Sequence, residues 1–402
     1  MSGTTNDTAP RIALDGPSAL AFYRDRAEVD SQSQLFDTYV VRTEPEPRAD
    51  ADGDAWLSDE DIAATLAETN IFGHCSDFES VLQSPADVPS PTIKRTRMRT
   101  LSQCASSSQA LRSIPYGRVG VRPSSGACPL YLLIPNNQRR RRINGVCQRV
   151  CTAGIPDRSF YTAEDIVCVP TPEFTFVLMA RYLNLLGLMM LAMELCGYYR
   201  LLGATTLQPL HSLRALYGQQ PLTSVARLRS FVDRAEGFYG ISACRRALDQ
   251  VANNAASPME TILYLMLCLP RRYGGYGVKR PILNAKLPVN ALAHGVTAAS
   301  NLVPDLYWPS ARLDMEYDSE EFHTDADSLQ SGRRRTLALQ AMDVQVISMS
   351  IDILRSHDSF DVVASTIMRA LGQRRHKATE TDRQKRIALR NSLLFRDDIY
   401  RK

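Results

Sequence analysis

The feature that most restricts the fold is a run of six residues, 313–318, in which apolar and acidic side chains alternate. Successive side chains of an extended strand point to opposite faces, so this run predicts a β-strand with one apolar and one acidic face. The acidic face carries Asp314, Glu316 and Asp318. A strand of this kind needs a sheet that buries only one of its faces against a core.

The residues just before this run predict a second strand with the same division between faces. In residues 305–308 (Asp-Leu-Tyr-Trp), the aspartate and tyrosine alternate with the two large apolar side chains. A four-residue loop over 309–312 pairs Asp305 with Glu316, whereas a two-residue loop pairs Asp305 with Asp314. Both registers predict an antiparallel hairpin that collects three or four carboxylates on one face.

Carboxylates that lie opposite each other in a sheet repel, and a divalent cation is the simplest way to hold several of them together. Mg²⁺ prefers hard oxygen ligands, usually one or two carboxylates with water and substrate phosphates. Such a metal can polarise a phosphoryl oxygen and activate a water molecule. The alternative interpretation is an antiparallel sheet whose acidic face lies in water.

The sequence over 305–323, DLYWPSARLDMEYDSEEFH, resembles the Vsr-like endonuclease-related domains, which are allied to the PD-(D/E)XK nucleases. These domains have an Asp-apolar strand, a short turn, a strand that ends in Glu-x-Asp, and then Phe-His. An arginine-bearing helix and a further strand follow, here matched by Arg333–Arg335 and 344–347. Upstream, Ser257-Pro-Met-Glu260 matches the Ser-x-x-Glu helix start, so the resemblance covers about 257–355.

The resemblance implies a hydrolase that cuts DNA with Mg²⁺ or Mn²⁺. It implies that Asp305 and Glu316 are the primary metal ligands, and that Asp318 and Glu260 are ligands or supporting acids. His323 stands where related enzymes place a catalytic or orienting histidine. The resemblance assigns nucleic-acid contacts to three consecutive arginines, Arg333, Arg334 and Arg335.

One departure from the family pattern bears directly on activity. The family has a lysine two residues after Glu316, and this chain has Asp318 there. The positive charge would then come from His323 or an arginine, or the domain would be an inactive binder. Other roles also stay open: Glu260 can complete a capping box with Ser257, His323 can cap the next helix, and the arginines can form a solvated helix face.

The first half of the chain resembles, more weakly, the accessory region of AbiEi-type abortive-infection antitoxin-like proteins. The matching residues are Gly16–Leu20, Tyr23-Arg24 and the segment 169–182, VPTPEFTFVLMARY. Those relatives often join such a region to a Vsr-like domain. The resemblance implies phage defence or nucleic-acid handling, with a protein partner for the N-terminal region, rather than a particular substrate.

Three parts are expected: an accessory region over 1–205 with an acidic linker near 43–54, a helical connector over 206–256, and a nuclease-like domain over 257–402. The fold class is α/β, with a mixed N-terminal region and helical bundle before a PD-(D/E)XK-like order of α, β, β, α, β, α. The segment 83–126 is expected to be an exposed loop. Two short strands are expected at 131–134 and 166–169, and helices at about 56–69, 172–202, 223–236 and 240–253.

Charge and cysteine content limit the partners and the compartment. The net charge is only +4, but residues 366–402 contain 11 basic and 4 acidic residues, which suits a polyanionic partner or a solvated helix. Nine scattered cysteines without a secretory signal favour free thiols in the cytoplasm. The apolar stretch 174–203 is interrupted by Arg181 and Glu194, which predicts a buried helix rather than a membrane span.

Overall fold

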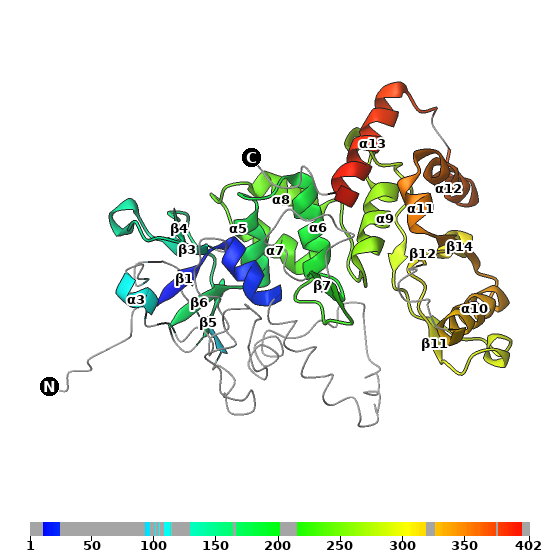
Figure 1. Ribbon diagram of the computed structural model, residues 1–402, viewed down its shortest axis with the longest axis horizontal. Coiled ribbons are helices and arrows are strands. Elements are labelled where there is room, and N and C mark those ends of the chain that lie inside the picture. Colours follow the sequence, from blue (N-terminus) through cyan, green and yellow to red (C-terminus); the bar gives the residue numbers. More distant parts are fainter. Residues whose placement is uncertain are drawn as a thin grey trace.

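In a computed structural model of the chain, the structure describes residues 11–24, 93–96, 101, 104, 108–112, 114, 129–163, 166–201, 215–318, 326–374 and 377–395. The expected helix at 56–69, the linker near 43–54 and His323 lie outside these residues. The fold is mixed α/β, with the larger sheets at opposite ends of the long axis and helices between them (Figure 1).

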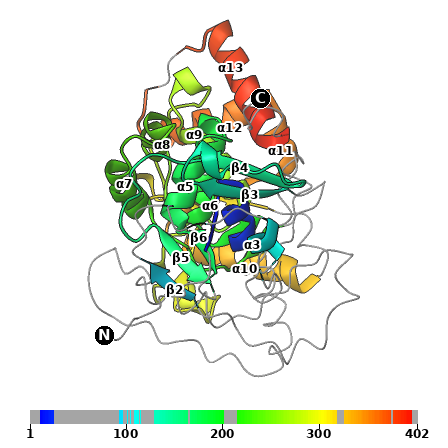
Figure 2. The ribbon, with the colours of Figure 1, turned by 90° about the vertical axis from the view of Figure 1, so that its left-hand side faces the viewer.

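The N-terminal sheet has six strands in the order β2-β5-β6-β1-β3-β4, and Figure 2 views it from the outer side with the helices behind. Its strands are β1 (Ile12–Leu14), β2 (Ile93–Thr96), β3 (Leu130–Ile134), β4 (Val146–Val150), β5 (Phe160–Ala163) and β6 (Val167–Pro170). The strands expected at 131–134 and 166–169 are therefore confirmed as β3 and β6. The expectation of a loop throughout 83–126 is wrong, because β2 pairs with β5 and α3 (Ser108–Arg112) is helical.

The helices behind this sheet are α5 (Pro172–Met179), α6 (Leu185–Leu195), α7 (Val225–Arg234) and α8 (Ile241–Leu248). The single helix expected over 172–202 is wrong. The side chain of Asn184 accepts a hydrogen bond from the Gly187 amide at 2.9 Å and starts a second helix there. After α6 the chain forms a two-stranded sheet of β7 (Tyr199–Leu201) and β8 (Ala215–Tyr217).

A buried ion pair joins α6 to a helix described over residues 16–24. The guanidinium of Arg24 donates to both carboxylate oxygens of Glu194, at 2.8 and 2.6 Å. Arg200 lies beside it and donates to the Glu194 backbone carbonyl at 2.8 Å. Because each of these groups is almost fully buried, the charges depend on one another rather than on water.

The C-terminal part opens with α9 (Pro258–Cys268), and its sheet has four strands in the order β14-β13-β12-β9. These strands are β9 (Ile282–Leu283), β12 (Leu306–Trp308), β13 (Leu313–Tyr317) and β14 (Gln345–Met349). The remaining elements are β10 (Leu287–Pro288), β11 (Asn301–Leu302), α10 (Ala326–Ala341), α11 (Ile351–Arg355), α12 (His357–Ala370) and α13 (Glu380–Phe395). Strand β9 was not expected, since a two-residue strand carries no alternation.

The hairpin register is the one expected for a four-residue loop. Leu306 lies opposite Met315 and Trp308 lies opposite Leu313. The loop closes through a turn of 3₁₀ helix and Arg312, whose φ is 46°. Strand β13 pairs in parallel with β14 on its other side, so the acidic strand is central in the sheet.

The two faces of this sheet pack against different helices. Leu306, Trp308, Leu313 and Met315 belong to the largest hydrophobic cluster, which contains side chains of α9 and α11–α13 and also reaches into the N-terminal half. On the opposite face, Tyr307 packs with Ala338 and Leu339 of α10. The acidic face therefore lies under a helix, and the interpretation of an acidic face in open water is wrong.

The glycines after α9 are required by a close approach of backbone. A Cβ atom at Gly275 would lie 1.9 Å from the carbonyl oxygen of Leu269, so the chain can fold back along the helix end only with glycine there. The amide of Val278 then donates to the Leu267 carbonyl at 2.9 Å. In the described part of the chain, no helix is both long enough and apolar enough to span a membrane.

Candidate functional site

A single guanidinium joins the two carboxylates that the sequence analysis ranks first. Nη2 of Arg335 lies 2.8 Å from Oε1 of Glu316 and 3.6 Å from Oδ1 of Asp305. Arg335 comes from α10, while Glu316 lies in β13 and Asp305 directly precedes β12. The strand pairing and the helix above it thus bring both acids to one positive charge.

Asp305 is fixed by the strand next to it. Its Oδ2 accepts a hydrogen bond from the Tyr317 amide at 3.1 Å. Burial raises the pKa of Asp305 to about 6, although the Tyr317 amide and Arg335 oppose that rise. The negative charges of Glu316 and Asp318 raise this pKa further, which places both groups within electrostatic reach of Asp305.

Asp314 is the most deeply buried acid of the cluster. Its residue is 0% exposed, and neither carboxylate oxygen accepts a hydrogen bond from any described residue. Burial and the charges of Glu316 and Asp305 raise the pKa of Asp314 to about 9. The carboxyl therefore holds a proton at neutral pH, and that proton can be shared with the Glu316 carboxylate beside it.

Glu260 reaches the cluster from the first turn of α9. The Glu260 amide donates to the Ser257 hydroxyl at 3.1 Å, so the expected helix cap is present. The Glu260 carboxylate accepts from the Ala256 amide at 2.8 Å and from the Asn284 side chain at 2.6 Å. Burial and the charge of Asp305 raise the pKa of Glu260 to about 7. Glu260 thus lies beside the cluster, but its carboxylate accepts from the Ala256 amide rather than from the Ser257 amide of the expected capping box.

The remaining candidates are placed differently from one another. Asp318 is half-buried beyond the end of β13, and its amide donates to the Met349 carbonyl at 2.9 Å. Arg333 and Arg334 are exposed on α10 and do not share the position of Arg335. The three arginines therefore do not form one phosphate-binding face, as three consecutive helical residues cannot.

The cluster offers the donor type of a Mg²⁺ or Mn²⁺ site but not a complete ligand shell. In the described segments, no three acidic, histidine or cysteine side chains are grouped as around a metal ion. The carboxylates of Asp305 and Glu316 both face the guanidinium of Arg335. Mg²⁺ commonly takes one or two carboxylates together with water and substrate phosphate. The carboxyl oxygens of Asp314, which accept no hydrogen bond from a described residue, lie on the same strand face as Glu316. The donor set therefore fits a hard divalent cation held by Asp305 and Glu316.

Two residues of this cluster are not among the candidate site residues that the sequence predicts. The period of two places Asp314 on the acidic face with Glu316, but the resemblance gives Asp314 no role. Asn284 follows β9 in a left-handed conformation with a φ of 50°. Its amide donates to the Asp305 carbonyl at 3.0 Å while its side chain donates to Glu260, so it links the two acids. No sequence pattern marks an asparagine after so short a strand.

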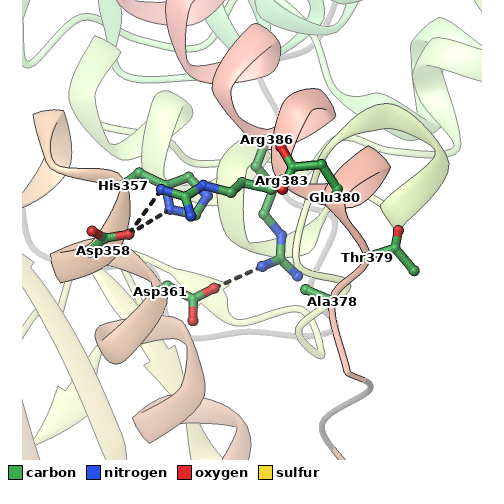
Figure 3. Close-up of a pocket in the computed structure, with 8 residues that line it drawn as sticks. All are labelled: His357, Asp358, Asp361, Ala378, Thr379, Glu380, Arg383 and Arg386. Atoms are coloured by element: carbon green, nitrogen blue, oxygen red, sulfur yellow. Dashed lines mark hydrogen bonds and ion pairs between the residues drawn. The ribbon is translucent and has the colours of Figure 1, made fainter.

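Away from the carboxylate cluster, a polar cavity lies between α12 and α13 (Figure 3). Its volume is about 330 Å³, and its side chains include His357, Asp358, Asp361, Thr379, Glu380, Arg383 and Arg386. Figure 3 shows the arginines of α13 facing the aspartates of α12, and Arg386 donates to Asp361 at 2.7 Å. Because Asp361 and Asp358 pair with Arg386 and Arg383, little positive charge is left in the cavity to bind a phosphate.

The same contacts change the interpretation of the basic C-terminal segment. Arg386 and Arg390 are buried, and Arg390 donates to the Leu354 carbonyl at 3.0 Å. Part of the positive charge counted in the sequence thus holds α13 against α11 and α12. The expectation that the excess of basic residues over 366–402 is available to a polyanion is wrong for these two arginines.

Comparison with protein-family models, with curated proteins and with solved structures found no match to this chain. Its function must therefore be inferred from the side chains themselves.

Proposed function

We propose that the C-terminal part of this chain is a divalent-metal-dependent DNA endonuclease of the Vsr-like, PD-(D/E)XK kind, which acts in phage defence or repair. The observation that carries the proposal is the convergence of Asp305 and Glu316 on one positive charge over the acidic sheet face. The elements β12, β13, α10, β14 and α11 follow one another in the order that the resemblance implies, whereas β9, β10 and β11 lie between α9 and β12 and are additional to that order.

The chemistry follows from the donors around this point. A divalent cation bound by Asp305 and Glu316 would polarise a phosphoryl oxygen of the substrate and activate a water molecule. Glu260, with a pKa of about 7, is suited to hold a proton near neutral pH. Asp318 adds negative charge near Asp305, and this charge favours cation binding. Arg333 and Arg334 remain exposed, where they can contact the phosphates of DNA.

A second candidate function is a catalytically inactive nucleic-acid-binding or antitoxin-like regulator that retains the nuclease fold. The observation in its favour is that the guanidinium of Arg335 supplies a positive charge to both Asp305 and Glu316, at the point where a metal would bind. The absence of the family lysine from position 318 points in the same direction. The two candidate functions differ in whether the cluster binds a metal and cuts.

Cleavage of a panel of DNA substrates with Mg²⁺ or Mn²⁺ separates these functions. Glu316→Gln keeps the shape of the side chain but removes one ligand charge, so cleavage falls by orders of magnitude while DNA binding is retained. The matched control is Asp343→Asn, which removes an exposed carboxylate after α10 (88% exposed) and should leave cleavage unchanged. A wild-type protein that binds DNA with a clear salt dependence but cuts no substrate would favour the regulator.

A further inference from the structure

Arg335 occupies the point at which the carboxylates of Asp305 and Glu316 meet. Its Nη2 donates a hydrogen bond to the backbone carbonyl of Val303, while the two carboxylates lie at ion-pair distance and Oε1 of Glu316 accepts no hydrogen bond from a described residue. The Nε of the same guanidinium is buried without a hydrogen-bond partner in the described part of the chain. One donor of Arg335 is therefore unused in this arrangement. Because a buried N–H without an acceptor costs free energy, an acceptor at this position would stabilise the guanidinium.

The partial exposure of Arg335 bears on whether its side chain can move while its helix stays in place. It is 38% exposed, so its guanidinium lies at the boundary between the cluster and solvent. The helix is held by Ala338 and Leu339, which are fully buried against Tyr307. Side-chain rotation alone would therefore move the charge away from the carboxylates, without any displacement of α10.

We infer that Arg335 is a built-in competitor of the divalent cation, and that it transfers its guanidinium from Asp305 and Glu316 to a substrate phosphate when the cation binds. This inference rests on the proposed function, because it assumes that these two acids hold a metal. It also assigns the positive charge that the family lysine would supply to a residue of α10. The planar guanidinium, with its unused Nε–H donor, matches phosphate oxygens in a two-point contact.

The competition predicts opposite effects of one substitution on two measurements. Arg335→Met keeps the length and apolar stem of the side chain but removes the competing charge. Because the metal-competent state is then fully populated, Mn²⁺ should bind the DNA-free protein about tenfold tighter in calorimetric titration. The same variant should lose at least about a hundredfold in single-turnover cleavage, since the phosphate loses its positive partner. Arg335→Lys should restore part of the cleavage.

An exposed arginine outside the proposed site provides the control for general charge effects. Arg355→Met removes the same charge from an exposed position at the end of α11, and it should leave both Mn²⁺ affinity and cleavage within about twofold of wild type. The inference would be overturned if Arg335→Met bound Mn²⁺ no more tightly than wild type. It would also be overturned if Arg335→Met cleaved DNA as fast as wild type. If the wild-type protein binds no Mn²⁺ through Asp305 and Glu316, the proposed function fails and this inference fails with it.

Discussion

Substitution of Asp314 by asparagine should change how the stability of the metal-free protein depends on pH. The folded pKa of Asp314 is raised to about 9 from an ordinary value of 3.8. A carboxyl with a raised folded pKa stabilises the fold most below its unfolded pKa, and this stability is lost as pH rises toward the folded pKa. Between pH 5 and pH 8 the loss is about 4 kcal/mol, at 1.36 kcal/mol per pH unit.

Asp314→Asn has no proton to lose, and its amide is uncharged over this pH range, as the protonated acid is. Urea unfolding followed by circular dichroism, at pH 5, 6.5 and 8 with chelator present, measures both proteins. The free energy of unfolding of the variant should exceed that of wild type by an amount that grows toward pH 8. Parallel curves for the two proteins over this range would refute the assignment of a proton to Asp314. Asp343→Asn, at an exposed carboxylate, should follow the wild-type curve.

Two further predictions concern charges outside the carboxylate cluster. Although burial alone would raise the pKa of Glu194, the ion pair with Arg24 lowers it. Glu194→Gln removes the negative charge that faces Arg24 in this buried pair and should destabilise the fold by about 3–5 kcal/mol in urea unfolding. An unchanged urea midpoint would contradict this. The double variant Arg333→Ala/Arg334→Ala should reduce the slope of log K for DNA binding against log salt by about 2, since each lost phosphate contact removes roughly 0.9; an unaltered slope would show that neither arginine contacts phosphate.

The hairpin was the part of the fold most open to prediction from sequence. Alternation with a period of two determines which side chains share a face, and this inference needed only local information. The register stayed open between a two-residue and a four-residue loop, and the structure decides it by pairing Leu306 with Met315. Local information did not show that α10 lies over the acidic face. The segment that forms α10 has few apolar residues, and its packing against Tyr307 depends on the tertiary fold.

The break between α5 and α6 illustrates a second limit. Residues 172–202 are apolar enough to suggest one continuous helix, yet the Asn184 side chain caps a new helix within that stretch. Whether Asn184 caps a new helix or the first helix continues depends on how the residues before and after it pack in the fold. Helix propensity read from the local sequence carries no information on that packing. Likewise, the sequence did not indicate which of the three arginines faces Asp305 and Glu316; in the structure it is Arg335. That choice depends on the rotation of α10 about its axis.

The measurement that tests the central claim most directly is the melting temperature of wild type and of Asp305→Ala/Glu316→Ala, each with and without Mn²⁺. A ligand at 100 times its dissociation constant stabilises the native state by about 2.7 kcal/mol, which corresponds to about 5–10 °C for a domain of this size. We predict a shift of that order in wild type and none in the double variant. Equal shifts in the two proteins would show that Asp305 and Glu316 do not hold the metal, and would contradict the proposed site.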